Sequence, residues 1–506
     1  MKYLIGCDVG TSGTKTVLFD ESGKIISSAY RSYPLYQPET GWAEQDPDGW
    51  ADAAFATIAE AVAESGVDPS DVAGIGLSGQ MHGLVMLDEK GKVLRKSIIW
   101  CDQRTQEECV LLTSLIGGDR LKRITGNPAI TGFTTPKILW VQRHEPETWR
   151  KCAHILLPKD YVRFRLTGQL ITDMADGSGM QLADIGERRY SKEMLGALSI
   201  DENMVPVLKE SASEGGRLTA EAAKKCGLRQ GLPVAASAGD QAAAAIGNGV
   251  VREGLFSCNV GTSGVVFAHT DTPLCDPSGR VQTFCHAVPG KWHVMGVTQG
   301  AGLSMKWFKD NFYAEEAARN PKVYKVIDDG AATISEAGAH GLFYLPYLMG
   351  ERTPHLDPKA KGVFFGITPS HKREDFARAV MEGVGYSLLD CLNVISELGG
   401  RPDEIRLCGG GTNSALWRRM LTDIFGCECV TTNSTEAGAL GAAILAGVAS
   451  GTYHDVNSAC ERMIRVTERY TPDERNAEIY AERYPVYRGL YAALKDSFAA
   501  AENFYR

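Results

Sequence analysis

Short apolar runs separated by polar turns open the chain, and this pattern predicts strands. Five runs have this character: Tyr3–Cys7, Thr14–Phe19, Lys24–Tyr30, Val72–Leu77 and Leu84–Leu87. Between the third and the fourth run, Asp46-Pro47 marks a helix start, and apolar residues then recur at helical spacing. These apolar positions are Trp50, Phe55, Ile58 and Val62. Strands that come first and then alternate with helices predict mixed α/β layers.

The opening pattern returns in the middle of the chain. Leu255–Val260 and Val265–His269 are strand-like, and the turn between them is Gly261-Thr262-Ser263-Gly264. The first two strands of the chain flank the same four residues, Gly-Thr-Ser-Gly, at positions 10–13. A strand–turn–strand unit that recurs halfway along 506 residues indicates a duplicated fold, although such turns also recur by coincidence. We therefore predict two domains, residues 1–247 and 248–506.

Helical and strand-like segments alternate in the second half of the chain. The predicted elements are helices at Gly302–Phe312, Arg373–Leu398, Leu416–Phe425 and Glu436–Ala449, and a strand at Glu404–Cys408. Gly399-Gly400 follows the longest helical segment and is a typical C-terminal stop. This alternation supports the α/β interpretation.

Composition and charge exclude several classes of protein. The net charge is −9 without a basic stripe, which argues against nucleic acid as a partner. The 13 cysteines are an odd number without a CxxC pair, which argues against a disulfide framework and a structural zinc site. The N-terminal apolar run is too short for a signal peptide, and the Ala-rich run 437–449 is too short to cross a bilayer. We therefore expect a cytoplasmic protein without a membrane partner.

The two Gly-Thr-Ser-Gly turns are candidates for phosphate binding. A phosphate chain needs convergent backbone N–H groups without side-chain bulk, and glycines with small hydroxyl residues provide them. Asp8, at the end of the first strand, can hold a hydrated Mg²⁺ that bridges the phosphates. One such turn from each domain predicts a nucleotide, ATP, in a cleft between the domains.

Other glycine-rich motifs narrow the kind of nucleotide site. No Gly-x-x-x-x-Gly-Lys-[Ser/Thr] occurs, which excludes a P-loop kinase. The Gly-x-Gly-x-x-Gly at Gly74–Gly79 is followed by another strand-like run, so we do not interpret it as a dinucleotide-binding motif. Gly409-Gly410-Gly411 and Asn413 lie between a strand and a helix, where a ring or a ribose could lie against the backbone. An ordinary strand-to-helix loop is the alternative.

Asp240 lies at a predicted strand-to-helix junction after Leu232–Ala238. One interpretation is an N-cap, for which Asp is a preferred residue. Another is a general base that takes a proton from an attacking sugar hydroxyl, and the two are compatible. Residues that follow strand-like segments of the first half are candidates for sugar binding: Met81, His82, Trp100, Asp102 and Arg104. For His82 alone, a structural histidine is the alternative.

Two longer motifs carry a resemblance to a known family. The first is Gly132-Phe-Thr-Thr-Pro-Lys137-Ile-Leu-Trp140. The second is Gly362-Val-Phe-Phe-Gly366-Ile, followed by Asp375-Phe-Ala-Arg-Ala-Val-Met-Glu382. With these motifs the chain resembles the FGGY family of carbohydrate kinases, and it is most similar to the xylulokinases of that family. The resemblance implies two actin-like (ribonuclease H-like) ATPase domains with an active-site cleft between them.

The resemblance also implies roles for single residues. It makes Asp240 the expected catalytic base and Asp8 the expected partner of Mg²⁺. Residues expected near ATP are Thr11, Ser12, Gly13, Gly261, Thr262, Gly302, Gly410, Gly411 and Asn413. Residues expected near the sugar are Met81, His82, Trp100, Asp102, Arg104, Asp240 and Gln241. The chain departs from many bacterial xylulokinases at Gln241, where they have Asn.

The expected reaction is the ATP-dependent phosphorylation of a ketopentose, D-xylulose to D-xylulose 5-phosphate. Alternatives within the family are kinases for another ketose, a polyol or an aldonate, such as ribulose, glycerol or gluconate. More distant alternatives are an actin-like ATPase without a sugar substrate and a non-catalytic sugar sensor. We expect a homodimer only by analogy with the family.

Overall fold

The computed structural model describes residues 1–334 and 337–504. Its first sheet is built around β1 (Tyr3–Val9), which pairs antiparallel with β2 (Gly13–Asp20) and parallel with β5 (Val72–Gly79). On one side β2 continues to β3 (Ile25–Ser32), again antiparallel. On the other side β5 pairs in parallel with β14 (Pro233–Ala235) and β15 (Ala238–Gly239). The opening meander predicted from the sequence is therefore confirmed.

The second sheet repeats this order. Its central strand β16 (Leu255–Val260) pairs antiparallel with β17 (Gly264–Thr270) and parallel with β22 (Glu404–Cys408). Beyond β17 lies the antiparallel β19 (Trp292–Thr298), and beyond β22 lies the parallel β23 (Cys429–Thr432). Both sheets thus have three meandering strands followed by parallel ones, with a Gly-Thr-Ser-Gly turn at the same place. The duplicated α/β fold is confirmed.

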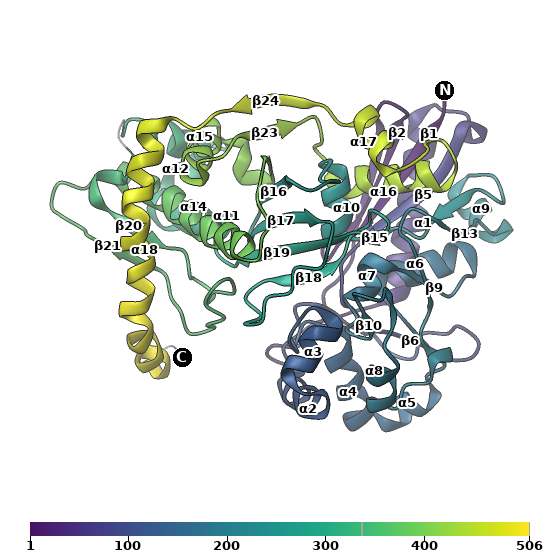
Figure 1. The fold of residues 1–506 in the computed structure, drawn as a ribbon. Helices are drawn as coiled ribbons and strands as arrows, with labels where there is room; N and C mark the ends of the chain where they lie inside the picture. Colours follow the sequence, from purple (N-terminus) through teal and green to yellow (C-terminus); the bar gives the residue numbers. More distant parts are fainter. Residues whose placement is uncertain (335–336, 505–506) are drawn as a thin grey trace.

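Two helices join the halves of the molecule. α10 (Asp240–Gly247) and α16 (Ala437–Ala449) lie where the two sheets approach each other (Figure 1). Although α16 comes late in the chain, it packs on β1 and β5 of the first sheet. The domain boundary at residues 247/248 stays a prediction.

Glycines explain how closely these helices pack. A Cβ on Gly76 would lie 1.8 Å from the carbonyl oxygen of Ala442, and a Cβ on Gly441 would lie 1.8 Å from that of Ala243. Gly76 belongs to the Gly-x-Gly-x-x-Gly of the sequence, and that motif lies wholly within β5. Gly74 and Gly76 therefore admit the backbone of α16, whereas Gly79 faces Lys159 and Val9, which gives the motif a packing explanation.

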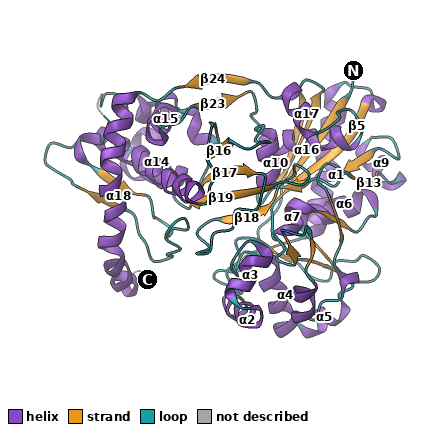
Figure 2. Ribbon diagram, in the orientation of Figure 1, coloured by secondary structure: helices purple, strands orange, loops and turns teal. Residues whose placement is uncertain are grey.

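A lobe of short helices is inserted after β5. It contains α2 (Gln106–Ile116), α3 (Gly118–Thr125) and α4 (Thr134–His144), which lie together below the first sheet in the views of Figures 1 and 2. Buried hydrogen bonds tie this lobe to β18 (Gln282–Cys285) of the second half. Asn127 Nδ2 donates to the Thr283 carbonyl at 2.7 Å, and the Cys285 N–H donates to Ser178 Oγ at 3.1 Å.

Most predicted helices are confirmed with shifts of one or two residues. They are α1 (Pro47–Ser65), α11 (Ala301–Phe312), α14 (Arg373–Glu397) and α15 (Ala415–Phe425). Sequence patterns did not predict the C-terminal helix α18 (Glu474–Ala501), which covers the outer side of the second half (Figure 1). Within the described residues, every helix is too short or too polar to cross a membrane.

Candidate active site

The first Gly-Thr-Ser-Gly turn is held in place by side chains from three other segments. Gln45 Nε2 donates to the Thr11 carbonyl at 2.7 Å, and Tyr30 Oη donates to the Ser12 carbonyl at 3.2 Å. Trp100 Nε1 donates to Thr11 Oγ1 at 2.9 Å. Trp100, predicted for the sugar, is thus next to a residue predicted for the phosphates. A Cβ on Gly13 would lie 2.5 Å from the Arg31 carbonyl, so only glycine fits there.

Asp8 lies near the end of β1 beside that turn. Its Oδ1 is buried and has no hydrogen-bond partner within the described part of the chain. Burial raises the pKa of the Asp8 carboxyl, the nearby Glu436 raises it further, and Lys15 lowers it. Lys15 in turn forms an ion pair with Glu436 of the second half. An orphan carboxylate oxygen in such a position fits a bound cation, because the cation would supply the missing partner.

Asp240 is the first residue of α10, and Gly239 is the N-cap, without a side-chain capping bond. The N-cap interpretation of Asp240 is therefore wrong. Burial, and after it the negative charge of Asp8, raises the pKa of the Asp240 carboxyl to about 7, whereas the backbone N–H and side chain of Gln241 oppose this rise. A carboxyl with this pKa can accept a proton at neutral pH, which a free aspartate does only weakly.

Met81 and His82 form a buried floor next to Asp240. A Cβ on Gly239 would lie 2.7 Å from Met81 Cγ, so the two segments are in close contact. His82 has a left-handed backbone with φ 67°, its Nδ1 lies 3.0 Å from the Gly179 carbonyl oxygen, and its ring stacks on Phe133 at 4.3 Å. Burial and the charge of Lys137 lower the pKa of His82 to about 3. His82 is therefore neutral at physiological pH.

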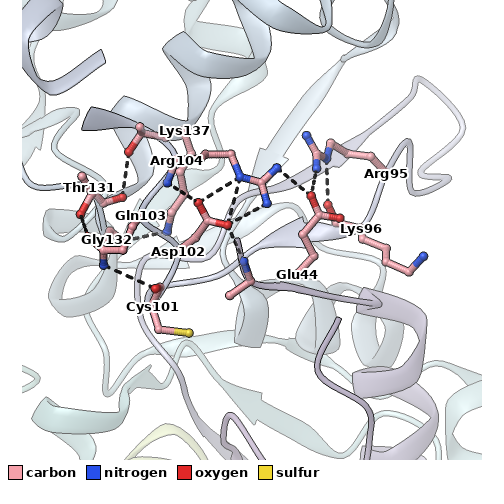
Figure 3. A network of polar contacts seen from close by, with 12 residues as sticks. Glu44, Arg95, Lys96, Cys101, Asp102, Gln103, Arg104, Thr131, Gly132 and Lys137 are labelled. Atoms are coloured by element: carbon pink, nitrogen blue, oxygen red, sulfur yellow. Dashed lines mark hydrogen bonds and ion pairs between the residues drawn. The ribbon is translucent and has the colours of Figure 1, made fainter. Parts of the chain in front are cut away.

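Asp102 and Arg104 direct their charges at each other (Figure 3). Arg104 Nη2 donates to Asp102 Oδ2 at 2.7 Å, and Arg104 Nη1 donates to Glu44 Oε1 at 2.8 Å. The Ala43 N–H donates to Asp102 at 2.6 Å, and the Arg104 guanidinium lies 3.6 Å from the ring centre of Trp42. Both side chains are buried, so these contacts favour a positioning role. Their direct contact with a sugar stays a prediction.

The segment that Asp102 and Arg104 fix presents Trp100 to solvent. Trp100 is 44% exposed, although its ring N–H is bonded to Thr11. Lys137 of α4, which the sequence marks only as part of a longer motif, donates to the carbonyls of His82 and Gly132 at 2.7 Å each. Burial lowers the pKa of Lys137 to about 7. Lys137 thus fixes the backbone of the loop that carries His82.

Six of the residues expected near ATP line one cavity of about 960 Å³ in the second half. They are Gly261, Thr262, Gly302, Gly410, Gly411 and Asn413. The Gly302 N–H donates to the Gly261 carbonyl at 2.8 Å and the Leu303 N–H donates to the Thr262 carbonyl at 3.0 Å, which fixes the second turn against α11. Thr11, Ser12 and Gly13 do not line this cavity. Their contact with phosphates stays a prediction.

Sequence reasoning missed several residues of this region. Tyr324 and Asp328 of α13 (Val323–Ala331) and Trp417 of α15 also line the 960 Å³ cavity of the second half. A buried cluster also supports the floor of the sugar site, in which Lys159 Nζ lies 2.6 Å from Asp173 and 3.2 Å from Asp176. Only the presence of charged residues in otherwise apolar segments could have indicated this cluster.

Comparisons with known proteins agree over the whole chain. Residues 3–247 match the N-terminal domain and residues 256–450 the C-terminal domain of the FGGY family of carbohydrate kinases. Xylulose kinase of Bacillus subtilis (strain 168) is 38% identical, over 100% of this chain and 99% of that protein. Xylulose kinase of Escherichia coli (strain K12) is 39% identical, over 97% of this chain and 99% of that protein.

Solved structures show the same fold. The structure of ligand-bound xylulose kinase from Lactobacillus acidophilus has a TM-score of 0.92 and 30% identity, and the match covers 99% of this chain and 100% of that one. The family match spans both Gly-Thr-Ser-Gly turns, Asp240 and the nucleotide cavity of the second half. The chain therefore belongs to the FGGY family of carbohydrate kinases.

Proposed function

We propose that this carbohydrate kinase transfers the γ-phosphoryl group of ATP to the terminal hydroxyl of D-xylulose. The observation that carries the proposal is Asp240, a half-buried carboxyl at the start of α10 whose pKa desolvation raises to about 7. The preceding residue, Gly239, lies against Met81 of the predicted sugar floor, and Asp240 is within electrostatic reach of Asp8. The similarity to proteins named xylulose kinase supports the choice of sugar.

Each group then has a role in the reaction. The sugar binds on the first half, against Met81, His82 and Trp100, with a hydroxyl directed at Asp240. ATP binds in the cavity of the second half, with its phosphates directed at the two turns. Asp240 accepts the hydroxyl proton as the oxygen attacks the γ-phosphorus. Neutral His82 supplies ring nitrogens for hydrogen bonds without adding charge.

Mg²⁺ is proposed at Asp8. The orphan Oδ1 of this carboxylate fits a hard cation with oxygen ligands. When bound, such an ion neutralises charge on the phosphates. Burial and the nearby Glu436 raise the pKa of Asp8, so a cation would offset both effects. The expectations of a cytoplasmic location and of a homodimer remain as made from the sequence.

The test is an assay of ADP release with Mg²⁺ and ATP across D-xylulose, L-xylulose, D-ribulose, L-ribulose, glycerol and gluconate. We expect the highest kcat/KM with D-xylulose. Preference for another sugar would keep the kinase and replace the substrate. ADP release that does not depend on any sugar would favour an actin-like ATPase, and no release at all would favour a sugar sensor.

The role of Asp240 has a separate test. Asp240→Ala should lower kcat by roughly 10²–10⁴-fold, the usual effect of removing a general base. Asp423→Asn is the matched control, because Asp423 is a partly desolvated carboxyl of α15 that accepts from Asn476 far from the site. An unchanged kcat in Asp240→Ala would remove the base from this proposal.

A further inference from the structure

Arg352 has a charged group without a partner. It lies in the loop between β20 (Phe343–Leu345) and β21 (Val363–Phe365), and its side chain is partly buried. Its guanidinium makes no hydrogen bond and no ion pair with any residue in the described parts of the chain. The charge of the adjacent Glu351 offsets part of the cost of desolvating the guanidinium, and a ligand would supply the hydrogen-bond partner that it lacks.

The adjacent carboxylate, Glu351, is already used by other donors. Glu351 Oε2 accepts from Thr298 Oγ1 at 2.6 Å and from Ser387 Oγ at 3.0 Å. Glu351 Oε1 accepts from the Gln299 N–H at 3.1 Å and from the Arg352 N–H at 2.7 Å. The carboxylate therefore fixes the backbone at Arg352 and leaves the guanidinium free.

The backbone on the other side of Arg352 is fixed as well. The Thr353 N–H donates to the Val297 carbonyl at 3.0 Å, and the Val297 N–H donates to Thr353 Oγ1 at 3.0 Å. These bonds attach the loop to the end of β19. The backbone position from which the Arg352 side chain extends is therefore fixed on both sides.

The loop of Arg352 is attached close to residues of both predicted substrate sites. The end of β19 pairs with the second phosphate turn, because Thr298 is opposite Gly264. On the other side is His82 of the first half, whose ring lies 5.8 Å from that of Phe284 on the neighbouring β18. Burial is the main cause of the lowered pKa of His82, and the charge of Arg352 contributes to it across the two halves.

We infer that Arg352 contacts the phosphoryl group as it passes from ATP to the sugar. A guanidinium matches two phosphoryl oxygens at once and stays charged, whereas a neutral sugar offers no counter-charge. The inference rests on the proposed kinase reaction. In that reaction the bond from the sugar oxygen to the γ-phosphorus forms, and the bond from the γ-phosphorus to the bridging oxygen breaks. ADP leaves with that electron pair, Asp240 takes the hydroxyl proton, and Arg352 donates hydrogen bonds without transferring a proton.

The experiment compares Arg352→Gln and Arg352→Lys with the wild type. We expect Arg352→Gln to lower kcat by on the order of 10²-fold or more, as for other arginines that stabilise a transferring phosphoryl group. Arg352→Lys should recover part of the rate, because lysine keeps the positive charge but cannot donate two parallel hydrogen bonds to the phosphoryl oxygens. Sugar binding without nucleotide, followed by tryptophan fluorescence, should stay within about twofold, since no phosphoryl group is present.

Arg280→Gln is the matched control. Arg280 lies beside the same loop, but its guanidinium pairs with Asp276 and Glu397. We expect its loss to lower the Tm and to leave kcat within about threefold. Added guanidinium ion should restore part of the rate in Arg352→Ala and none in Arg280→Ala, a response that a structural role does not produce.

Two outcomes would overturn the inference. One is a kcat within threefold of the wild type in Arg352→Gln. The other is a loss confined to sugar affinity, with kcat unchanged, which would make Arg352 a sugar ligand. If Arg352→Gln does not fold, Arg352→Lys and the rescue of Arg352→Ala decide. The measurements use whichever sugar the wild type phosphorylates, so failure with D-xylulose counts against the proposed substrate and not against Arg352.

Discussion

Lowering the pH below neutrality should stop the reaction by protonating Asp240. The pKa of this carboxyl is about 7, so at about pH 6 roughly a tenth of the enzyme carries the ionised base. Since only that form accepts the proton, kcat/KM should fall about tenfold for each pH unit below the pKa. An ordinary aspartate, with a pKa of about 3.9, would leave kcat/KM flat down to about pH 5.

The causes of the raised pKa of Asp240 suggest two control experiments. Burial of Asp240 is its largest cause and the charge of Asp8 the next, whereas the side chain of Gln241 opposes the shift. Gln241→Leu should therefore move the inflection to higher pH. A divalent cation at Asp8 offsets the charge of that residue, so the profile of kcat at saturating Mg²⁺–ATP should move to lower pH.

The assay is kcat/KM for D-xylulose from about pH 5 to pH 9 at constant ionic strength, measured by quenched flow of labelled ATP so that no coupling enzyme limits the rate. His82 cannot cause the inflection, because its pKa is about 3. Lys137 has a pKa of about 7 and needs its own control, so Lys137→Met should retain the inflection. The argument from burial would be refuted if kcat/KM of the wild type did not change with pH although Asp240→Ala still lowered the rate.

Three further predictions concern packing, ATP affinity and the pH dependence of stability. Gly76→Ala should destabilise the protein by about 3 kcal/mol, because its Cβ would meet the backbone of α16. Gly489→Ala, at an open position inside α18, should instead stabilise it by about 0.5–1 kcal/mol, and calorimetry checks both. Gly302→Ala places a Cβ 2.5 Å from the Gly261 carbonyl oxygen, so KM for ATP should rise about tenfold while sugar binding stays unchanged in titration calorimetry. Burial lowers the pKa of His293 to about 3. Since this histidine has a pKa of about 6.5 in the unfolded chain, the unfolded chain binds a proton that the folded protein does not, and the wild type loses stability as the pH falls below about 6.5. The free energy of unfolding of His293→Phe should therefore rise by about 2 kcal/mol relative to that of the wild type between about pH 7.5 and pH 5. Urea unfolding measures this difference, and an equal pH dependence of both proteins would contradict the prediction.

Local patterns predicted the parts of the fold that repeat. The two Gly-Thr-Ser-Gly turns are short-range signals, and their flanking strands alternate clearly enough to be placed within two residues. The topology could be predicted from the repeat, because two similar openings suggested two similar sheets. The strand-like run after Gly74–Gly79 correctly indicated that these glycines are not a dinucleotide-binding motif. The reason for a glycine at position 76 could not be predicted, because the helix that packs on it lies more than 360 positions later in the chain.

Long-range pairing could not be predicted from one sequence. Asp102 and Arg104 were selected as polar residues near a sugar, yet both turn inward because Glu44 and Trp42, from an earlier segment, supply their partners. Arg352 is the opposite case. No local motif marks it, and it stands out only when the contacts around Glu351 show that the adjacent carboxylate is occupied.

The residue proposed as the catalytic base lies at the joint between the halves. Asp240 is the first residue of α10, and α10 packs on α16 so closely that a Cβ on Gly441 would lie 1.8 Å from the Ala243 carbonyl oxygen. α16 in turn approaches the side chain of Asp8, which lies 3.1 Å from the place of a Cβ on Gly438. Asp8 lies on β1 and Asp240 directly follows β15, and both strands pair with β5, so the separation of the two carboxyls is set within the first sheet. Because the charge of Asp8 helps to set the pKa of Asp240, a separation fixed within one sheet keeps the strength of the proposed base independent of movement between the halves.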